Sequence, residues 1–414
     1  MHPLTLLFVA LLAAGTMLRL WLAQRQLSAV RTGRARVPAP FDARVTLEDH
    51  HKAADYTVAC GRLGIIETLV DAALLLGWTL GGGLALIDRL WSALALPPLL
   101  AGTAVILSAL VAMSVLSLPF GIYRTFVIEA RFGFNRTTPG IFVADHAKAL
   151  VLLLLLGTPL VLLVLWLMRT AGAAWWLYAW FAWVSFTLLL TWAYPTFIAP
   201  LFNKFTALDD TALAARINAL LERCGFHSKG IFVMDGSRRS SHGNAYFTGL
   251  GNAKRIVFFD TLLKGLEPAE IEAVLAHELG HFRKKHVRKR LVLGIVLALA
   301  GFAVLGLVAQ TPWFYDAFGV QSSAHMALLL FLLVAPVFTF PLTPLGSWLS
   351  RRDEFEADAY AVEQADAQSL AQALVKLYRD NATTLTPDPL HSRFYDSHPP
   401  APIRVARLGE LATR

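Results

Sequence analysis

Charged side chains are scarce in this sequence. Asp, Glu, Lys and Arg make up 16% of its 414 residues, while 56% are hydrophobic. A soluble globular protein has about a quarter of its residues charged, so this composition argues against one. Cysteine is rarer still, because only Cys60 and Cys224 are present, in dissimilar segments. A disulfide framework and a thiolate metal site are therefore disfavoured, and any metal ligands would be histidines and carboxylates.

Long apolar runs take the place of charge. A membrane-spanning helix needs about 20 mostly apolar residues. The first run lacks a basic segment before it and contains Arg19, so it reads as an uncleaved span rather than a signal peptide. The sequence predicts a mainly helical membrane protein with seven spans, at Leu4–Leu22, Gly64–Ile87, Pro98–Phe120, Ala149–Leu167, Ala174–Tyr194, Leu291–Gln310 and Ala324–Leu349.

The net charge of +8 is explained by membrane topology. Of the 37 Lys and Arg residues, 34 fall in segments on one side of the predicted spans, two on the other, and Arg19 lies in a span. Because basic residues concentrate in the cytosol, we expect the amino terminus outside and the carboxyl terminus in the cytosol. No basic stripe is interleaved with aromatic residues, so nucleic acid is not an expected partner. Glu67 and Asp71 lie one helical turn apart in the second span and should face the bundle interior, a watery cavity or a neighbouring helix.

One polar helix is predicted to carry chemistry. Pro268 and Glu270 suit the first turn of a helix. His277 and His281 follow at i and i+4, so both imidazoles project from one face. That spacing suits two nitrogen ligands of one tetrahedral zinc ion, with Glu278 beside them as a general base. Two surface histidines on a basic helix are the alternative.

A catalytic zinc site needs a third protein ligand. Val287 stands where a metzincin would have a histidine, so that class is excluded. A thermolysin-like site takes a glutamate from a later helix, and Glu354, Glu356 and Asp353 are all available on one. The residues alone leave these three open, and a charged surface helix is an equally reasonable interpretation.

Three motifs together resemble the type I CAAX prenyl protease family and, more distantly, the HtpX membrane proteases. The resemblance covers nearly the whole chain, including two stretches, 236–247 and 254–263, that are similar to the segment before the family's metal helix. The motifs are His277-Glu-Leu-Gly-His281, Glu354-Phe-Glu-Ala-Asp358, and Ser397-His-Pro-Pro400 followed by Arg404.

The resemblance implies a membrane-embedded zinc metalloendopeptidase. It implies one Zn²⁺ held by His277, His281 and Glu354, with Glu278 as general base and Asp358 orienting a ligating histidine. It also implies a barrel of seven transmembrane helices that encloses a chamber lined by Glu67 and Asp71, with a gluzincin-like zinc domain capping it on the cytosolic side.

Two further residues are assigned by the resemblance alone. It implies that His398 stabilises the oxyanion and that Arg404 holds carboxylates or the substrate. Read from the residues, the His-Pro-Pro segment would be a solvated extended loop.

The chain divides into four parts under this interpretation. Residues 1–194 hold spans one to five with cytosolic loops, and 195–290 form a cytosolic protease segment with a small sheet and the metal helix. Residues 291–349 hold spans six and seven, and 350–414 form a cytosolic tail with the third ligand and an active-site loop.

A substrate could join the predicted sheet as an extended strand. Asn244, Ala245 and Tyr246 lie in a strand-like run, and an exposed edge there could pair with a peptide. The neighbouring strands are expected at Ile231–Met234 and Arg255–Phe259, with Gly249, Gly251 and Asn252 marking the turn.

Two other function classes compete with the protease. One is a non-catalytic membrane binding or quality-control factor of the same fold; the other is a seven-span receptor or transporter with an accidental motif. The intact Glu278 favours the enzyme. The expected partners are the lipid bilayer and a peptide or protein substrate that is prenylated or membrane-inserted. The chain is shorter than eukaryotic members of the family, which suggests a bacterial inner-membrane protein acting in CAAX processing or membrane-protein quality control.

Overall fold

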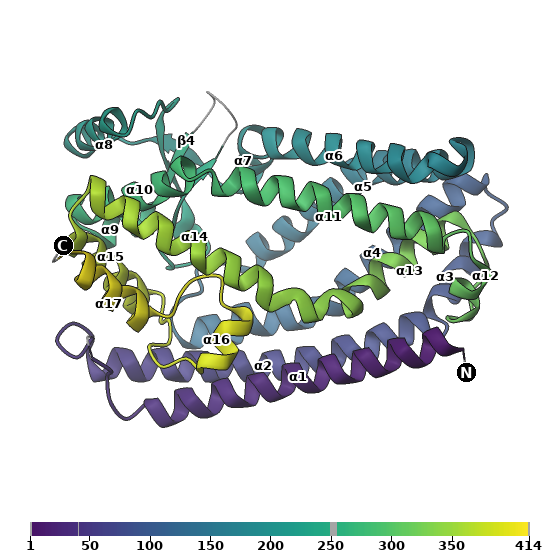
Figure 1. Cartoon of the computed structure of the whole chain (residues 1–414), viewed down its shortest axis with the longest axis horizontal. Coiled ribbons are helices and arrows are strands. Elements are labelled where there is room, and N and C mark those ends of the chain that lie inside the picture. Colours follow the sequence, from purple (N-terminus) through teal and green to yellow (C-terminus); the bar gives the residue numbers. More distant parts are fainter. Residues whose placement is uncertain (1, 40, 249–254, 413–414) are drawn as a thin grey trace.

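The computed structural model describes residues 2–39, 41–248 and 255–412. Long helices run along the longest dimension of the molecule (Figure 1). The sheet and a group of shorter helices gather at one end, where the chain also finishes, while the amino terminus lies at the other end. The molecule therefore has a long helical part and a compact end that carries the sheet.

The long helical part matches the predicted spans. Six helical segments in the described residues are long and apolar enough to cross a membrane. A seventh is the pair α2 and α3, which is bent by 47° where Gly82 adopts a left-handed φ of 81°. Counted with this pair, the seven predicted spans are confirmed, the second of them broken. The helices are α1 (Pro3–Gly33), α2 (Leu47–Thr79), α3 (Gly83–Ser92), α4 (Pro98–Tyr123), α5 (Pro139–Thr170), α6 (Trp175–Ala193), α11 (His286–Val308), α13 (Ala324–Thr339) and α14 (Thr343–Gln364).

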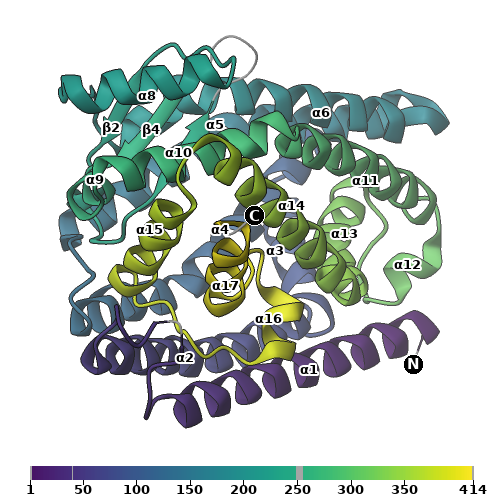
Figure 2. The same ribbon diagram turned by 60° about the vertical axis from the view of Figure 1, so that its left-hand side comes forward.

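These helices form a closed ring of neighbours. Each packs on the next in the order α1, α2, α3, α4, α5, α6, α11, α13, and α13 returns to α1. Figure 2 shows α1 and α2 along one side, with α5 and α6 along the opposite side. The ring agrees with the expected barrel of membrane helices.

Short irregular helices join the long ones. Two π-helical segments, η1 (Arg124–Glu129) and η3 (Tyr194–Ile198), continue α4 and α6. The turn η5 (Phe340–Leu342) joins α13 to α14, and α14 then runs without a break past residue 349, where the last span was predicted to end. The remaining connectors are η2 (Gly172–Ala174), α7 (Ala199–Phe202) and α12 (Pro312–Asp316).

A four-stranded sheet lies at the compact end in the order β1-β2-β4-β3. Strands β2 (Ile231–Met234) and β4 (Arg255–Phe259) have the predicted bounds and pair in parallel. Strand β3 (Ala245–Thr248) pairs antiparallel with β4 and forms an edge, whereas β1 (Phe205–Ala207) was not predicted. The expected turn at Gly249, Gly251 and Asn252 lies outside the described residues.

Besides α14, five helices share a core with this sheet at the compact end, and a sixth, α16, packs on α14 and α1 nearby. Their core joins Ile217, Phe258, Leu275 and Leu370, so the sheet and the predicted metal helix share one apolar interior. Burying these side chains stabilises the position of that helix. The elements are α8 (Thr211–Arg223), α9 (Asp260–Gly265), α10 (Pro268–Arg283), α15 (Ala367–Asp380), α16 (Pro389–Tyr395) and α17 (Ala401–Ala412), with the turn η4 (Gly236–Arg238).

The two acidic residues of the second span have different surroundings. Glu67 accepts from Arg124 at 2.7 Å and thereby ties α2 to η1. Asp71 lines a small cavity of about 150 Å³ together with Arg19. The first carboxylate therefore bonds to a neighbouring helix, and the second faces a cavity, as charges within a membrane protein usually do.

Candidate active site

Helix α10 is built to hold its histidines against α14. Glu267 and Glu270 form a reciprocal capping box at its start, where Pro268 occupies the first turn. Lys376 of α15 also binds the Glu270 carboxylate at 2.7 Å. The helix is therefore fixed at its amino end by both its own cap and a neighbouring helix.

Gly280 sets the distance between α10 and α14. A Cβ atom at this position would lie 2.9 Å from both the Cα and the carbonyl oxygen of Ala357. Only glycine permits so close an approach without a shift of one helix. Gly280 directly precedes His281, and Ala357 lies one helical turn after Glu354. The close approach of the two helices therefore brings His277, His281 and Glu354 within reach of one metal ion.

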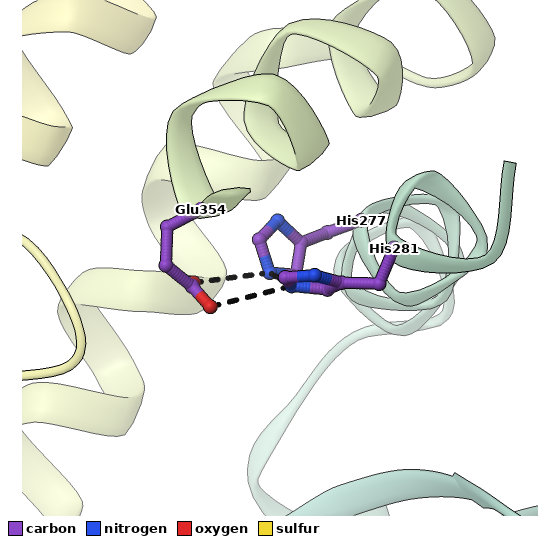
Figure 3. A group of neighbouring side chains, drawn as sticks. All are labelled: His277, His281 and Glu354. Atoms are coloured by element: carbon purple, nitrogen blue, oxygen red, sulfur yellow. Dashed lines mark hydrogen bonds and ion pairs between the residues drawn. The ribbon is translucent and has the colours of Figure 1, made fainter. Parts of the chain in front are cut away.

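Three donor groups converge between these helices (Figure 3). The Nε2 atoms of His277 and His281 are 3.2 Å apart. Glu354 places Oε2 3.4 Å from His277 Nε2 and Oε1 3.3 Å from His281 Nε2. Two ligand atoms about 2.0–2.1 Å from a tetrahedral zinc ion are themselves about 3.3 Å apart. The three separations therefore fit a single zinc ion.

The chemistry of the donors also fits a cation. His277 Nδ1 lies 2.9 Å from the Asp358 carboxylate, and a neutral imidazole that donates its proton there presents a lone pair at Nε2. That lone pair faces the Glu354 carboxylate at 3.4 Å. The Glu354 Oε2 atom is buried and accepts no hydrogen bond of good geometry, although His398 Nδ1 lies 2.9 Å away. Buried acceptors without donors are costly, and a divalent cation at their centre would satisfy all three.

Asp358 and Arg404 lie behind His277. The Asp358 carboxylate is 2.9 Å from His277 Nδ1, and Arg404 donates to both its oxygens at 2.7 Å. Burial alone would lower the pKa of Arg404, but the adjacent Asp358 carboxylate raises it, so the guanidinium stays charged. A carboxylate on the far nitrogen of a ligating histidine fixes the ring and its tautomer. The geometry therefore makes Asp358 the support of His277, with Arg404 as its counterion.

A residue that sequence reasoning missed supports the second histidine. His286 is buried, with its Nδ1 3.0 Å from Nδ1 of His281. Its Nε2 lies 3.2 Å from Glu356 and 3.6 Å from Asp353. Glu356 and Asp353, the other two candidates for the third ligand, therefore contact His286 and not the metal position. The available signal was a single histidine five residues after His281, inside a basic run.

A cavity of about 760 Å³ opens beside the three donors and is lined by His277, Glu278, Asn244, Ala245 and His398, among others. Glu278 is half-buried at its wall and forms no hydrogen bond or ion pair with any described residue. Its carboxylate is therefore available to a molecule in the cavity.

The third residue of the predicted substrate strand points elsewhere. Tyr246 is absent from the cavity wall, and its hydroxyl lies 3.9 Å from Met234 Sδ. Asn244 and Ala245 are the members of that segment whose side chains line the cavity.

Comparisons with known proteins cover almost the whole chain. Residues 26–204 match the family described as CAAX prenyl protease N-terminal, five membrane helices, and residues 207–412 match peptidase family M48. A CAAX prenyl protease 1 homolog of Caenorhabditis elegans is 32% identical over 97% of both chains. The chain belongs to the CAAX prenyl protease 1 family. An Arabidopsis thaliana homolog is 38% identical over 70% of this chain and 69% of its own length.

A solved structure of the family supports the same conclusion. The crystal structure of S. mikatae Ste24p superposes with a TM-score of 0.92, at 30% identity, over 99% of each chain. The present chain is therefore a multi-pass membrane protein. It is a zinc metalloendopeptidase of the CAAX prenyl protease 1 type, with zinc implied by the family. The predicted third ligand, Glu354, is confirmed as part of the His277–His281–Glu354 site.

Proposed function

We propose that the chain cleaves an extended segment of a membrane-associated protein in the cavity, with Glu278 as general base. The observation that carries this assignment is the unpaired carboxylate of Glu278 beside the metal donors. Glu354 and Asp358 are both committed to other groups at the site. Among the carboxylates near His277, Glu278 is the one left to accept a proton.

The roles of the site residues follow from their positions. His277, His281 and Glu354 would hold one zinc ion, which would supply Lewis-acid polarisation of the scissile carbonyl. Glu278 takes the proton of the attacking water and delivers it to the leaving amine. His398, at the cavity wall, donates to the carbonyl oxygen as negative charge develops there.

Arg404 acts at one remove from the substrate. Although it lines the cavity, it is only 5% exposed; its Nε and Nη2 donate to Asp358 and its Nη1 lies 3.5 Å from Glu354, so it holds these carboxylates in place. Of the two roles open to it, support of the carboxylates is the one that its contacts favour. In the described residues His277, His281 and Glu354 are the one group suited to a metal, which supports one zinc ion per chain.

The edge of the sheet offers a place for the substrate backbone. Phe259 donates its N–H to the Asn244 carbonyl at 3.0 Å, so these two residues face each other through the ladder. In an antiparallel ladder the next residue, Ala245, turns its N–H to the free edge. That N–H is bonded only to the Asn244 side chain, at 2.8 Å, and a peptide strand could take its place.

Ala245→Pro removes this outward N–H without removing a bond to β4. If the substrate pairs with the edge, the variant should lower kcat/KM by about tenfold, since one hydrogen bond to a bound peptide contributes about 1.5 kcal/mol. Steady-state peptide cleavage would measure it. Ala245→Ser, which keeps the N–H, is the matched control. Equal kcat/KM for the proline variant and the wild type would rule out pairing at Ala245.

The substrate class is proposed from the relatives. The Arabidopsis thaliana and Caenorhabditis elegans relatives are CAAX prenyl protease 1 homologs, which supports processing of prenylated CAAX proteins by this chain. The alternative, quality control of membrane proteins in bacteria, depends on a bacterial origin, and the relatives named above are eukaryotic.

A farnesylated CAAX peptide should be cleaved at least about tenfold more efficiently than the same peptide with an unmodified cysteine. The reason is that the isoprenoid partitions into the membrane beside the helical ring and raises the local concentration of substrate. Competition of the two peptides in reconstituted vesicles measures the ratio of kcat/KM directly. A ratio of one would favour the quality-control alternative.

The orientation of the chain is also a proposal. It rests on the 34 basic residues on one side of the spans against two on the other. Green fluorescent protein fused to the carboxyl terminus is expected to fluoresce in intact cells, because it folds in the cytosol. A fusion inserted in the 311–323 connection should stay dark, and the reverse pattern would invert the topology.

A further inference from the structure

A groove of about 510 Å³ lies between α2 and the end of α4 with η1, apart from the active site. Its walls are mainly apolar, and three of these side chains are exposed: Ile66 by 53%, Tyr123 by 49% and Val127 by 46%. The apolar wall consists of Leu63, Ile66, Pro119, Phe120, Tyr123 and Val127, and two cations, Arg62 and Arg131, line the same groove.

The two arginines lack an acidic partner among the residues that the structure describes. Neither Arg62 nor Arg131 forms a hydrogen bond or ion pair with the described residues, and no carboxylate lines the groove. The Arg131 guanidinium lies over the ring of Phe132, 5.6 Å from its centroid. Two uncompensated guanidinium groups therefore face a largely apolar groove.

The three carboxylates of α2 and η1 nearest in sequence to the two arginines contact other side chains. Neither Arg62 nor Arg131 therefore has a hydrogen-bonded carboxylate among the described residues. The engaged pairs are Glu67 with Arg124 at 2.7 Å, Asp55 with Arg34 at 2.9 Å, and Glu129 with His242 at 3.4 Å.

The groove lies at the boundary of the apolar spans. Arg62 directly precedes the span predicted from Gly64, and Arg131 follows the candidate span Pro98–Glu129. Pro119 and the π-helical turns of η1 interrupt the regular α-helix along one wall. The guanidinium groups thus lie at the level of lipid headgroups, and the apolar wall extends from them toward the level of acyl chains.

We propose that this groove binds one anionic phospholipid. The lipid phosphate would lie between Arg62 and Arg131, where charge-assisted hydrogen bonds are strong. One acyl chain would run along Ile66, Phe120 and Val127. Basic pockets between membrane helices on the basic side of a protein have the chemistry that recognises acidic headgroups. The charge and the apolar wall together select an anionic lipid over a zwitterionic one.

The test uses the full-length protein immobilised in neutral detergent with fluorescent phosphatidylglycerol. The wild type should retain it in the presence of excess phosphatidylcholine. Arg62→Gln with Arg131→Gln should weaken retention roughly thirtyfold, at about fivefold for each arginine. Ile66→Trp keeps both charges but fills the groove and should also reduce retention. The matched control, Arg31→Gln with Arg36→Gln, removes two exposed arginines outside the groove and should leave retention unchanged.

Several outcomes would overturn the proposal. Equal retention by the wild type and the Arg62/Arg131 variant would show that these arginines do not bind the lipid. Equal loss in the control pair would show that general surface charge, and not this groove, retains it. Displacement of the lipid by millimolar inorganic phosphate would make it a phosphate site. Displacement by a farnesylated peptide would make it part of the substrate path. Circular dichroism and peptide cleavage at the wild-type level confirm that each variant is folded.

Discussion

Glu278→Gln is expected to lower kcat by about 10³-fold, within the range that a general base contributes, while zinc content stays at the wild-type level. Glutamine has the shape of glutamate but cannot accept the proton of the attacking water. Glu278 is outside the set of metal donors and forms no hydrogen bond or ion pair within the described part of the chain. The substitution therefore isolates proton transfer from metal binding.

Cleavage of a quenched fluorescent peptide, with zinc measured on the same samples, checks this result. Glu363→Gln, at an exposed position of α14, is the matched control and should behave like the wild type. Wild-type turnover in the Glu278 variant would refute its role as the base. Equal zinc with no turnover even in the wild type would favour the non-catalytic binding factor of the same fold.

Glu354→Ala is expected to weaken zinc binding by more than about a hundredfold and to abolish cleavage. Loss of an outer partner of a ligand already costs 10–100-fold in metal affinity, so loss of a ligand itself must exceed about that range. The variant also leaves the two imidazoles of His277 and His281 without the carboxylate that lies 3.3–3.4 Å from them.

Zinc retention against a competing chelator measures this loss without reliance on activity. Glu356→Ala, on the same helix, removes a partner of His286, which itself contacts His281, and should weaken binding by no more than about tenfold. Glu363→Ala should have no effect. If Glu356→Ala lost zinc as completely as Glu354→Ala, the assignment of the third ligand would be wrong.

The spans and two of the strands could be predicted because their signals are local. An apolar run of about 20 residues has few alternatives to a membrane helix. The segment Ile231–Met234 and the segment Arg255–Phe259 are short apolar runs next to turn-forming residues, and both became strands. The break between α2 and α3 at Gly82 falls in a run of three glycines, a signal that a count of apolar residues overlooks.

The third ligand could not be chosen from local pattern. Glu354, Glu356 and Asp353 are equally good ligands, and helical periodicity does not say which face of α14 meets α10. The contact of Gly280 with Ala357 fixes that rotation, and it joins residues far apart in the sequence. The role of His286 could not be predicted for the same reason, since its partners Glu356 and Asp353 belong to α14.

The continuity of α14 has a consequence for the architecture as a whole. His281 and Glu354 are separated by 73 residues, and most of that interval is the helical hairpin α11–α13–α14. A metal ion held by His281, just before α11, and by Glu354 of α14 would thus cross-link the two ends of the hairpin, as a disulfide does across a long loop. No cut in the chain could release the catalytic end as a soluble fragment with its ligands intact. Metal occupancy therefore reports whether the two membrane arms are correctly paired, which makes it an assay of folding as well as of catalysis.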